Sequence, residues 1–222
     1  MRPFLSGRAC EPVRFCPTSG DFKGGGCMTV ARVGDRRTHL AQSALEVLSE
    51  TGYANTGVRD IAQRSSYSHG VLHYYFKDKS ALILEAVRLF KTGCVERYDA
   101  AIDGVTTAAG VLAAFEERLV DSLVTDGRLH RLWYDVRTQG WFGSVDGAAL
   151  AEIDALIEAM VVRVLDTYAR LSGLRLRVEA ATAYALVDGL FQRALQEHFQ
   201  GDENAPRALV ARVREAMPLL VG

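Results

Sequence analysis

Long apolar runs, proline and paired cysteines are all scarce in this chain of 222 residues. No segment approaches the roughly eighteen uninterrupted apolar residues that a membrane span needs, which excludes a membrane protein. The first residues, Met1 to Leu5, lack the long apolar core of a secretory signal, so we expect the cytoplasm as the compartment. Only five prolines occur, none of them between Pro17 and Pro206, and this stretch can therefore form long helices.

Residue patterns that usually mark an enzyme or a metal site are also missing. The four cysteines, Cys10, Cys16, Cys27 and Cys94, are not spaced as a Cys-x-x-Cys pair. There is no His-x-x-Glu-His sequence, no glycine-rich phosphate loop and no nucleophile elbow. We therefore expect no catalytic residue, no metal ligand and no cofactor, and we do not expect an enzyme.

The composition is that of a globular chain with a core, because 49% of the residues are apolar and 24% are charged. The charge is distributed unevenly. Residues 28–92 hold nine basic and six acidic side chains, whereas residues 93–222 hold thirteen basic and nineteen acidic ones. A basic front and an acidic rear suggest that a polyanionic partner would contact the front.

Residues 1–34 are expected to form a disordered extension. Three of the five prolines, three of the four cysteines and the run Gly24-Gly25-Gly26 lie there, without a hydrophobic period. Met28 follows directly, so a start of the native chain at Met28 and a functional N-terminal tail are both open. Almost everything after residue 34 is interpreted as helical, which predicts an all-α fold with a front domain at 35–92 and a rear domain at 93–222.

The front domain begins with a helix from Asp35 to Thr51. Asp35 can cap its start, and Gly52 can adopt the left-handed conformation that ends it. The apolar residues at helical spacing, which we expect to face inward, are Leu40, Ala44, Leu45 and Leu48.

Two short helices follow, joined by a tight turn. Val58 to Arg64 forms the first, and after a break Ser68 caps the second, from His69 to Phe76. The second helix turns Leu72 and Phe76 inward and carries unusually exposed aromatic and imidazole groups. This arrangement is typical of a helix-turn-helix. A further helix then opens at Asp78, its expected N-cap, with Leu82, Ala86 and Leu89 or Phe90 facing inward.

Two runs of the front domain, Gly52 to Ala62 (GYANTGVRDIA) and Ser68 to Lys79 (SHGVLHYYFKDK), closely resemble the TetR (tetracycline-repressor-like) family. In that family a glycine-aromatic turn and a "VRDIA" helix precede a recognition helix of the form S-x-G-T-L-Y-x-Y-F-x-x-K. The match runs in one unbroken register. Val71 and His73 stand where the family usually has Thr and Tyr.

The resemblance implies that the second short helix enters the major groove of double-stranded DNA, with its N-terminal residues at the base edges. Tyr75 and Lys79 look like the family's phosphate contacts, although Tyr75 could instead be partly core. Arg36 and Arg37 could reach a neighbouring groove or phosphate. The predicted DNA-binding residues are Arg59, Ser68, His69, Gly70, Val71, His73, Tyr74, Tyr75 and Lys79.

Five helices are predicted in the rear domain, at 110–126, 128–142, 148–171, 178–200 and 204–220. The second of them gathers aromatic residues beside polar ones, which is the composition of a cavity wall. In the family that the chain resembles, the rear domain holds a small-molecule pocket. The predicted pocket residues, each of which could instead be simply core, are Trp133, Tyr134, Arg137, Trp141, Phe142, Tyr184, Asp188 and Phe191.

Asp188 lies among apolar residues, so it either pairs with Arg137 or a ligand amine, or faces solvent. A homodimer is also expected, because one helix-turn-helix makes too few DNA contacts for useful specificity. In the resembling family the last two helices pair into a dimeric four-helix bundle. The apolar stripes that we expect at this interface consist of Ala183, Val187, Leu190, Ala194, Leu195, Val210, Val213 and Met217.

The sequence therefore predicts a ligand-responsive transcriptional regulator, most often a repressor in this family. It would bind a palindromic operator as a homodimer and release it when a small-molecule effector occupies the rear domain. The alternative is a ligand-independent regulator or activator whose rear domain only dimerises.

Overall fold

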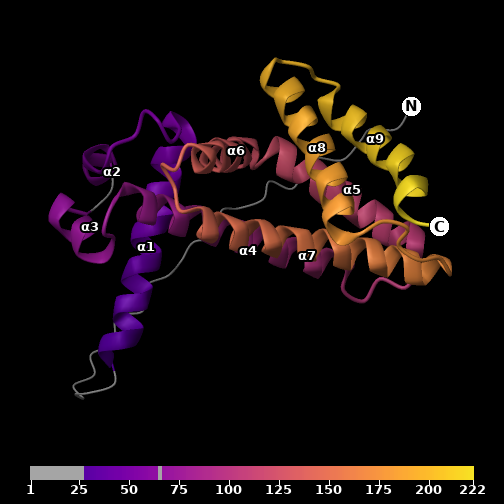
Figure 1. Ribbon diagram of the computed structural model, residues 1–222, viewed down its shortest axis with the longest axis horizontal. Helices are drawn as coiled ribbons and strands as arrows, with labels where there is room; N and C mark the ends of the chain where they lie inside the picture. The colour runs from indigo at the N-terminus through magenta and orange to yellow at the C-terminus, as the bar shows by residue number, and fades with distance from the viewer. Residues whose placement is uncertain (1–27, 65–66) are drawn as a thin grey trace, which may run out of the picture.

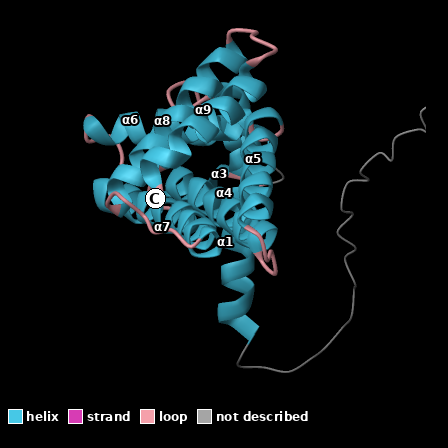
Figure 2. Cartoon of the chain, turned by 90° about the vertical axis from the view of Figure 1, so that its right-hand side faces the viewer, coloured by secondary structure: helices cyan, strands magenta, loops and turns pink. Residues whose placement is uncertain are grey.

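The computed structural model describes residues 28–64 and 67–222, with side chains described from Arg36 onward. Over these residues the fold is all-α, as expected, apart from one isolated bridge between Leu176 and Val221 (Figures 1 and 2). The helices are α1 (Met28–Thr51), α2 (Val58–Arg64), α3 (His69–Tyr75), α4 (Lys79–Ile102), α5 (Ala108–Val124), α6 (Gly127–Trp141), α7 (Gly147–Ser172), α8 (Ala180–Phe199) and α9 (Ala205–Leu220).

The first helix is longer than expected. α1 begins at Met28, so Asp35 lies well inside the helix and is not its N-cap, and residues 28–34 are helical rather than part of an irregular extension. No proline lies between Pro17 and Asp35, so nothing in this stretch prevents the helix from extending backwards past Asp35. The expectation of disorder for residues 1–27 lies outside the described residues, as does the predicted break at Ser65 and Ser66.

The predicted helix end at Gly52 and the predicted N-caps Ser68 and Asp78 are confirmed. Gly52 has a φ of 78°, the left-handed conformation that ends α1. Ser68 caps α3 by accepting a hydrogen bond from the Val71 amide at 3.4 Å, and Asp78 caps α4 by accepting from the Ala81 amide at 2.8 Å.

The helix α4 runs through the expected domain boundary at residue 92 without interruption (Figure 1). Its N-terminal half packs against α1 in the front domain, and its C-terminal half packs against α5 and α7 in the rear domain. Every rear helix begins and ends within two residues of its predicted position.

Two hydrophobic cores meet along α4. The front core joins the apolar faces of α1 to α4, and it also includes residues of α6 and α7. Trp133, Val136 and Ile153 from the rear domain belong to it and are buried almost completely. The front domain therefore does not close its own core. Residues of α6 and α7 in the rear domain complete it.

The expected dimer stripes are wrong for a physical reason. Ala183, Val187, Ala194 and Leu195 of α8, with Val213 and Met217 of α9, are buried in the chain's own rear core. Leu190 is partly buried against the same core, and Val210 is half-buried. Helical periodicity identified the apolar face of each helix correctly, but that face covers α5 and α7 rather than a second chain.

The turn between α1 and α2 is held from three directions. The Tyr53 amide donates to Asp135 Oδ2 of α6 at 2.9 Å, and the Tyr53 hydroxyl donates to the Ser144 carbonyl at 3.2 Å. Lys79, the first residue of α4, donates from Nζ to the Tyr53 carbonyl at 2.5 Å and lies 4.4 Å from the centre of the Tyr53 ring. We call residues 52–57 the Tyr53 turn, because Tyr53 connects them to both domains.

Replacing Asp135 should weaken this connection. We expect Asp135→Ala to lower the free energy of unfolding by about 1–2 kcal/mol, because the Tyr53 amide loses its acceptor. The comparison is Asp166→Ala, which removes an exposed carboxylate of α7 and should change stability by less than about 0.5 kcal/mol. Urea unfolding measures both, and equal stabilities of the two variants would show that the Asp135 contact contributes nothing.

Candidate nucleic-acid interface and internal cavity

One face of α3 is open to solvent while the opposite face is buried. Leu72 and the following Phe76 lie in the front core, whereas His69, His73 and Tyr74 are exposed, and Tyr74 exposes 80% of its surface. A Cβ atom added at Gly70 would meet nothing within 4 Å, so the backbone there can be approached closely. This face has the size and the polar groups to contact base edges in a groove.

The two histidines of this face form a pair. His69 Nε2 and His73 Nε2 lie 3.1 Å apart, one turn along α3, and their ring centres are 4.3 Å apart. One ring donates and the other accepts, which fixes the orientation of both. Their remaining edges face solvent, where they can exchange hydrogen bonds with a partner.

Three of the predicted DNA-binding residues also have structural roles. Ser68 Oγ is used by the cap of α3, and Val71 and Tyr75 are half-buried against the front core. Tyr75 packs edge-on against Tyr74 with 5.0 Å between the ring centres. Of the three N-terminal residues of α3, which were expected at the base edges, His69 and Gly70 are thus exposed and Val71 is half-buried.

The basic residues around α3 differ in how freely they can reach a phosphate. Arg59 is exposed on α2, and among the described residues it has no ion-pair partner. Lys79 is directed inward to the Tyr53 turn, and burial lowers the pKa of its ammonium group. Arg37 donates to the Tyr75 carbonyl at 3.4 Å and lies 3.5 Å from Glu85, so it braces α3 against α4.

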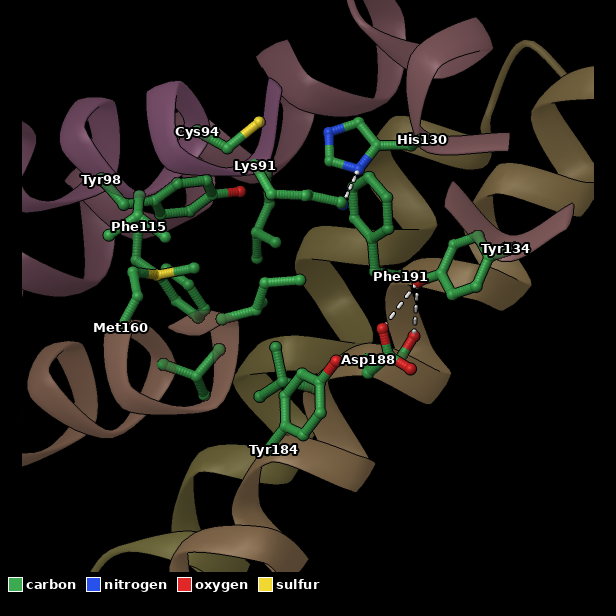
Figure 3. A pocket seen from close by; sticks show the side chains of 15 residues that line it. Lys91, Cys94, Tyr98, Phe115, His130, Tyr134, Met160, Tyr184, Asp188 and Phe191 are labelled. Carbon is green, nitrogen blue, oxygen red and sulfur yellow. Dashed lines mark hydrogen bonds between the residues drawn. The ribbon is translucent and has the colours of Figure 1, made fainter. Parts of the chain in front are cut away.

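A cavity lies inside the rear domain between α4, α5, α6, α7 and α8 (Figure 3). Its free volume is about 50 Å³. Most of its wall is apolar, and the polar or ionisable lining residues are Lys91, Cys94, Tyr98, His130, Tyr134, Tyr184 and Asp188.

Four of the eight predicted pocket residues line this cavity, namely Tyr134, Tyr184, Asp188 and Phe191. Arg137 lies behind Asp188. Trp133 is buried in the front core, and Trp141 and Phe142 expose 84% and 76% of their surfaces, so these three do not line it. The aromatic residues of α6 were predicted to form one cavity wall. In the structure Trp133 lies in the front core, Tyr134 lines the cavity and Trp141 faces solvent.

The acidic side of the cavity is a closed network. Asp188 accepts from Arg137 at 2.8 Å and from the Tyr134 hydroxyl at 2.8 Å, so of the two interpretations of Asp188 the paired one is confirmed. The Tyr184 hydroxyl donates to Asp154 at 2.6 Å, and Asp154 lies 3.5 Å from Arg137. Burial, and then the neighbouring Asp188 charge, raise the pKa of Tyr134 well above its usual value.

The cavity wall also holds a buried lysine, Lys91 of α4, which was not among the predicted pocket residues. Lys91 exposes 4% of its surface, and its Nζ donates to His130 Nδ1 at 3.0 Å. Burial lowers the pKa of Lys91 to about 8. Burial, and then the Lys91 charge, lower the pKa of His130 well below its usual value.

The signal for Lys91 was present in the sequence. It lies four residues after Val87 and three before Cys94, on the buried stripe of α4. A lysine at such a position has to be buried or to distort the helix packing.

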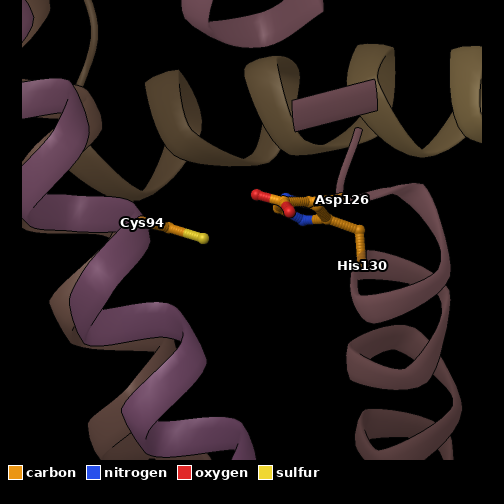
Figure 4. A group of neighbouring side chains, drawn as sticks. All are labelled: Cys94, Asp126 and His130. Carbon is orange, nitrogen blue, oxygen red and sulfur yellow. The ribbon is translucent and has the colours of Figure 1, made fainter. Parts of the chain in front are cut away.

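A group of possible metal ligands borders the cavity. Cys94 Sγ, an Asp126 carboxylate oxygen and a His130 ring nitrogen lie within 4.8 Å of one another (Figure 4), and these donor types suit zinc. However, Arg97 donates to Cys94 Sγ at 3.3 Å and to Asp126 at 2.6 Å. A guanidinium group therefore already takes the place of a cation, and we describe the cluster as an ion pair.

Comparison with known proteins decides the family. Residues 40–86 match the family model of bacterial regulatory proteins of the tetR family, and these residues include α2, α3 and both helix caps. Over these residues the chain has the DNA-binding helices of the TetR family. The predicted helix-turn-helix is thereby confirmed as the DNA-binding domain of a TetR-family transcriptional regulator.

Curated proteins that are similar to this chain are transcriptional regulators as well. It is 25% identical over 164 residues to the HTH-type transcriptional regulator BetI of Cronobacter sakazakii, covering 72% of this chain and 79% of BetI. It is 32% identical over 79 residues to the HTH-type transcriptional repressor KstR2 of Mycolicibacterium smegmatis, covering 36% of this chain and 38% of that repressor.

The fold is likewise shared. A proposed transcriptional regulator from Pseudomonas aeruginosa PAO1 superposes with a TM-score of 0.65 at 22% identity, over 86% of this chain and 95% of the other. These similar proteins are transcription regulators, and the family is not one of enzymes. No helix in the described part of the chain is long and apolar enough to cross a membrane.

The buried lysine leads to a prediction about stability and pH. The usual pKa of 10.5 and the pKa of about 8 in the folded state differ by an amount that corresponds to about 3 kcal/mol of destabilisation by the charged form. Below pH 8 Lys91 is charged in both states and the penalty is complete. Between pH 8 and 10.5 the folded state loses its proton first, so the penalty disappears as the pH rises.

We therefore expect Lys91→Met to be more stable than the original chain at pH 7, by up to about 3 kcal/mol, with a difference that shrinks toward pH 10. Urea unfolding of both proteins over this pH range measures the difference, in which the contributions of the buried tyrosines cancel. A variant that is less stable at pH 7 would mean that Lys91 is compensated in the folded state.

Proposed function

We propose that this TetR-family protein is a ligand-responsive repressor that binds a palindromic operator as a homodimer and releases it when a small molecule enters the cavity. The observation that carries the proposal is the course of α4, which borders the cavity at Lys91 and reaches the Tyr53 turn at Lys79. The name of the Mycolicibacterium relative, a repressor, supports repression over activation.

The DNA-facing part of the proposal rests on α3. Its exposed face offers His69, Gly70, His73 and Tyr74 to the major groove, with Arg59 of α2 directed at the phosphate backbone. Lys79 is the weakest member of the predicted set, because its ammonium group is directed inward to the Tyr53 carbonyl and lies over the Tyr53 ring.

The proposed dimer uses the outward face of α8. Thr182, Ala185 and Gly189 are exposed there, at the three- and four-residue spacing of one helix face. A Cβ atom added at Gly189 would meet nothing within 4 Å, and α9 adds the exposed Ala211 next to this face. Small side chains let a partner helix approach closely, so this face replaces the apolar stripes that the chain uses for its own core.

Release from DNA follows from the size of the cavity. Its volume of about 50 Å³ is far below the ≈ 300–1,000 Å³ of ordinary ligand pockets. A ligand of ordinary size therefore has to push α4 away from α7 or α8. Because Lys79 and Lys91 lie about 18 Å apart on one helix, such a displacement reaches the Tyr53 turn and changes the position of α3. A ligand that prefers the displaced state weakens operator binding by its differential affinity for the two states.

The alternative, a rear domain that only dimerises, has less support. A cavity kept solely for packing would be closed with apolar side chains, whereas this wall carries a lysine, a histidine and an aspartate.

The first experiment selects DNA from a random pool with the purified full-length protein. We expect a two-fold symmetric site. On that site Arg59→Ala should bind more weakly, and its slope of log affinity against log salt should fall by about one, because one phosphate contact is lost.

Arg170→Ala, which removes an exposed arginine of α7 far along the chain, provides the matched control and should leave the slope unchanged. If no sequence is enriched at low salt, the proposed operator binding is wrong. An unchanged slope for Arg59→Ala would remove only Arg59 from the interface.

The dimer face has its own test. We expect Ala185→Glu to convert the dimer into a monomer and to weaken operator binding by at least about ten-fold, because two carboxylates would be buried opposite each other. Ala159→Glu places the same charge on an exposed position of α7 and should stay dimeric. Sedimentation velocity distinguishes the two, and a dimeric Ala185→Glu protein would exclude this face.

A further inference from the structure

The ammonium group of Lys91 has no carboxylate within ion-pair distance among the described residues, and Asp188, the acidic residue of the cavity wall, is paired with Arg137 instead. Its hydrogen-bond partner is the neutral His130 ring, and the nearest ring centres, those of Phe90 and Trp133, lie 5.3 and 5.4 Å away. An ammonium group has three N–H donors, and in the described part of the chain only one of them has an acceptor. A buried charge in this state is costly, and an anion that reaches it would gain a desolvated, charge-assisted hydrogen bond.

We propose that the effector is a small organic acid, whose carboxylate pairs with Lys91 and whose apolar body fills the rest of the cavity. This inference rests on the proposed function, because it names the chemical class of the molecule that the cavity takes.

The arrangement of the cavity favours an acid over an amine. Asp188 is the only carboxylate in the wall, and Arg137 and the Tyr134 hydroxyl already occupy its two oxygens. Because Arg137 already neutralises Asp188, a ligand amine would gain little there, whereas a ligand carboxylate meets two unused N–H donors at Lys91. Figure 3 shows the lysine side chain extended toward His130, whereas Asp188 lies below them in this view, beside Tyr134.

His130 acts as a positioning residue for this lysine. Its Nδ1 accepts one N–H of Lys91 and thereby fixes the ammonium group at the cavity wall. The ring packs between Phe90 and Phe191, with centre distances of 5.0 and 4.8 Å, so it cannot turn away without disturbing the core.

The remaining wall determines the body of the ligand. Val95, Phe115, Leu119, Ile157, Met160 and Val161 present only apolar atoms at their side chains, apart from the Met160 sulfur. The tyrosine hydroxyls have partners of their own, since Tyr98 bonds to Ser122, Tyr134 to Asp188 and Tyr184 to Asp154. A branched aliphatic or a phenyl body therefore fits this wall better than a sugar or another polyol.

The test compares ligands that differ only in charge. Isothermal titration calorimetry at pH 7, on the full-length protein without DNA, uses isobutyrate, cyclohexanecarboxylate and 3-phenylpropionate, each alongside the amide and the amine of the same carbon skeleton. For at least one skeleton we expect the acid to bind at least about ten-fold more tightly than the amide and the amine.

The lysine is tested with variants. Lys91→Met should remove the preference for the acid and leave amide binding unchanged, whereas Lys91→Arg, which keeps the charge, should retain it. Lys77→Met removes a lysine exposed on the surface outside the cavity and should behave as the original chain. A melting curve for each variant shows that it is folded.

Each other outcome overturns the inference. A preference for the amine would assign the ligand to Asp188. Equal binding of acid and amide, no binding of any of the three acids, or an acid preference that survives in Lys91→Met would each exclude Lys91 as the anion partner.

The proposed function fails differently. If the acids bind through Lys91 but leave operator binding unchanged, the effector class stands and ligand-induced release is wrong. If an operator is found and no acid binds, the DNA-binding proposal stands and the effector class is wrong.

Discussion

The continuity of α4 is the constraint on which the rest of this structure depends. One proline-free helix of 24 residues supplies buried side chains to both hydrophobic cores, and α6 completes the front core from the other side through Trp133 and Val136. The two domains therefore share walls and are not joined by a flexible linker. Packed cores deform little, so a displacement of α4 in one domain is transmitted to the other. The hydrogen bond that the Tyr53 amide donates to Asp135, and the one that Lys79 donates to the Tyr53 carbonyl, make the helix-turn-helix part of the same rigid unit.

Lys91 interrupts an otherwise apolar stripe in the middle of this helix. A methionine of similar length would fill the same space without a desolvated charge. Natural chains agree with local packing rules over most of their length and depart from them mainly at functional sites. Lys91 is not the ion-pair partner of Asp188, because Arg137 pairs with that carboxylate. Nor does it pair with Asp126, because Arg97 donates to both Asp126 and Cys94. Among the described residues the lysine donates one hydrogen bond, to His130, and this bond does not require a full charge. The proposed contact with a ligand carboxylate would account for the charge.

The sequence predicted the front domain more closely than the rear one, because the residues that determine helix ends act locally whereas the packing partner of a helix does not depend on local sequence. Gly52, Ser68 and Asp78 act on the backbone within four residues of themselves, so their roles could be predicted without knowledge of the fold. Hydrophobic periodicity gives the apolar face of a helix but not the surface that covers it. For this reason the stripes on α8 and α9 were assigned to a dimer although they lie in the rear core, and Trp141 and Phe142 were placed in a cavity wall although they face solvent.

The cost of the Lys91 charge also bears on how a small cavity could drive a movement of α4. Coupling between two sites in a protein typically amounts to about 1–3 kcal/mol. The lowered pKa of Lys91, whose main cause is burial of the ammonium group, corresponds to a similar amount of about 3 kcal/mol. A carboxylate can relieve this cost only in a state in which the cavity has opened far enough to admit it. In the proposed mechanism the contact with Lys91, which forms only in the opened state, would supply the differential affinity that a population shift requires.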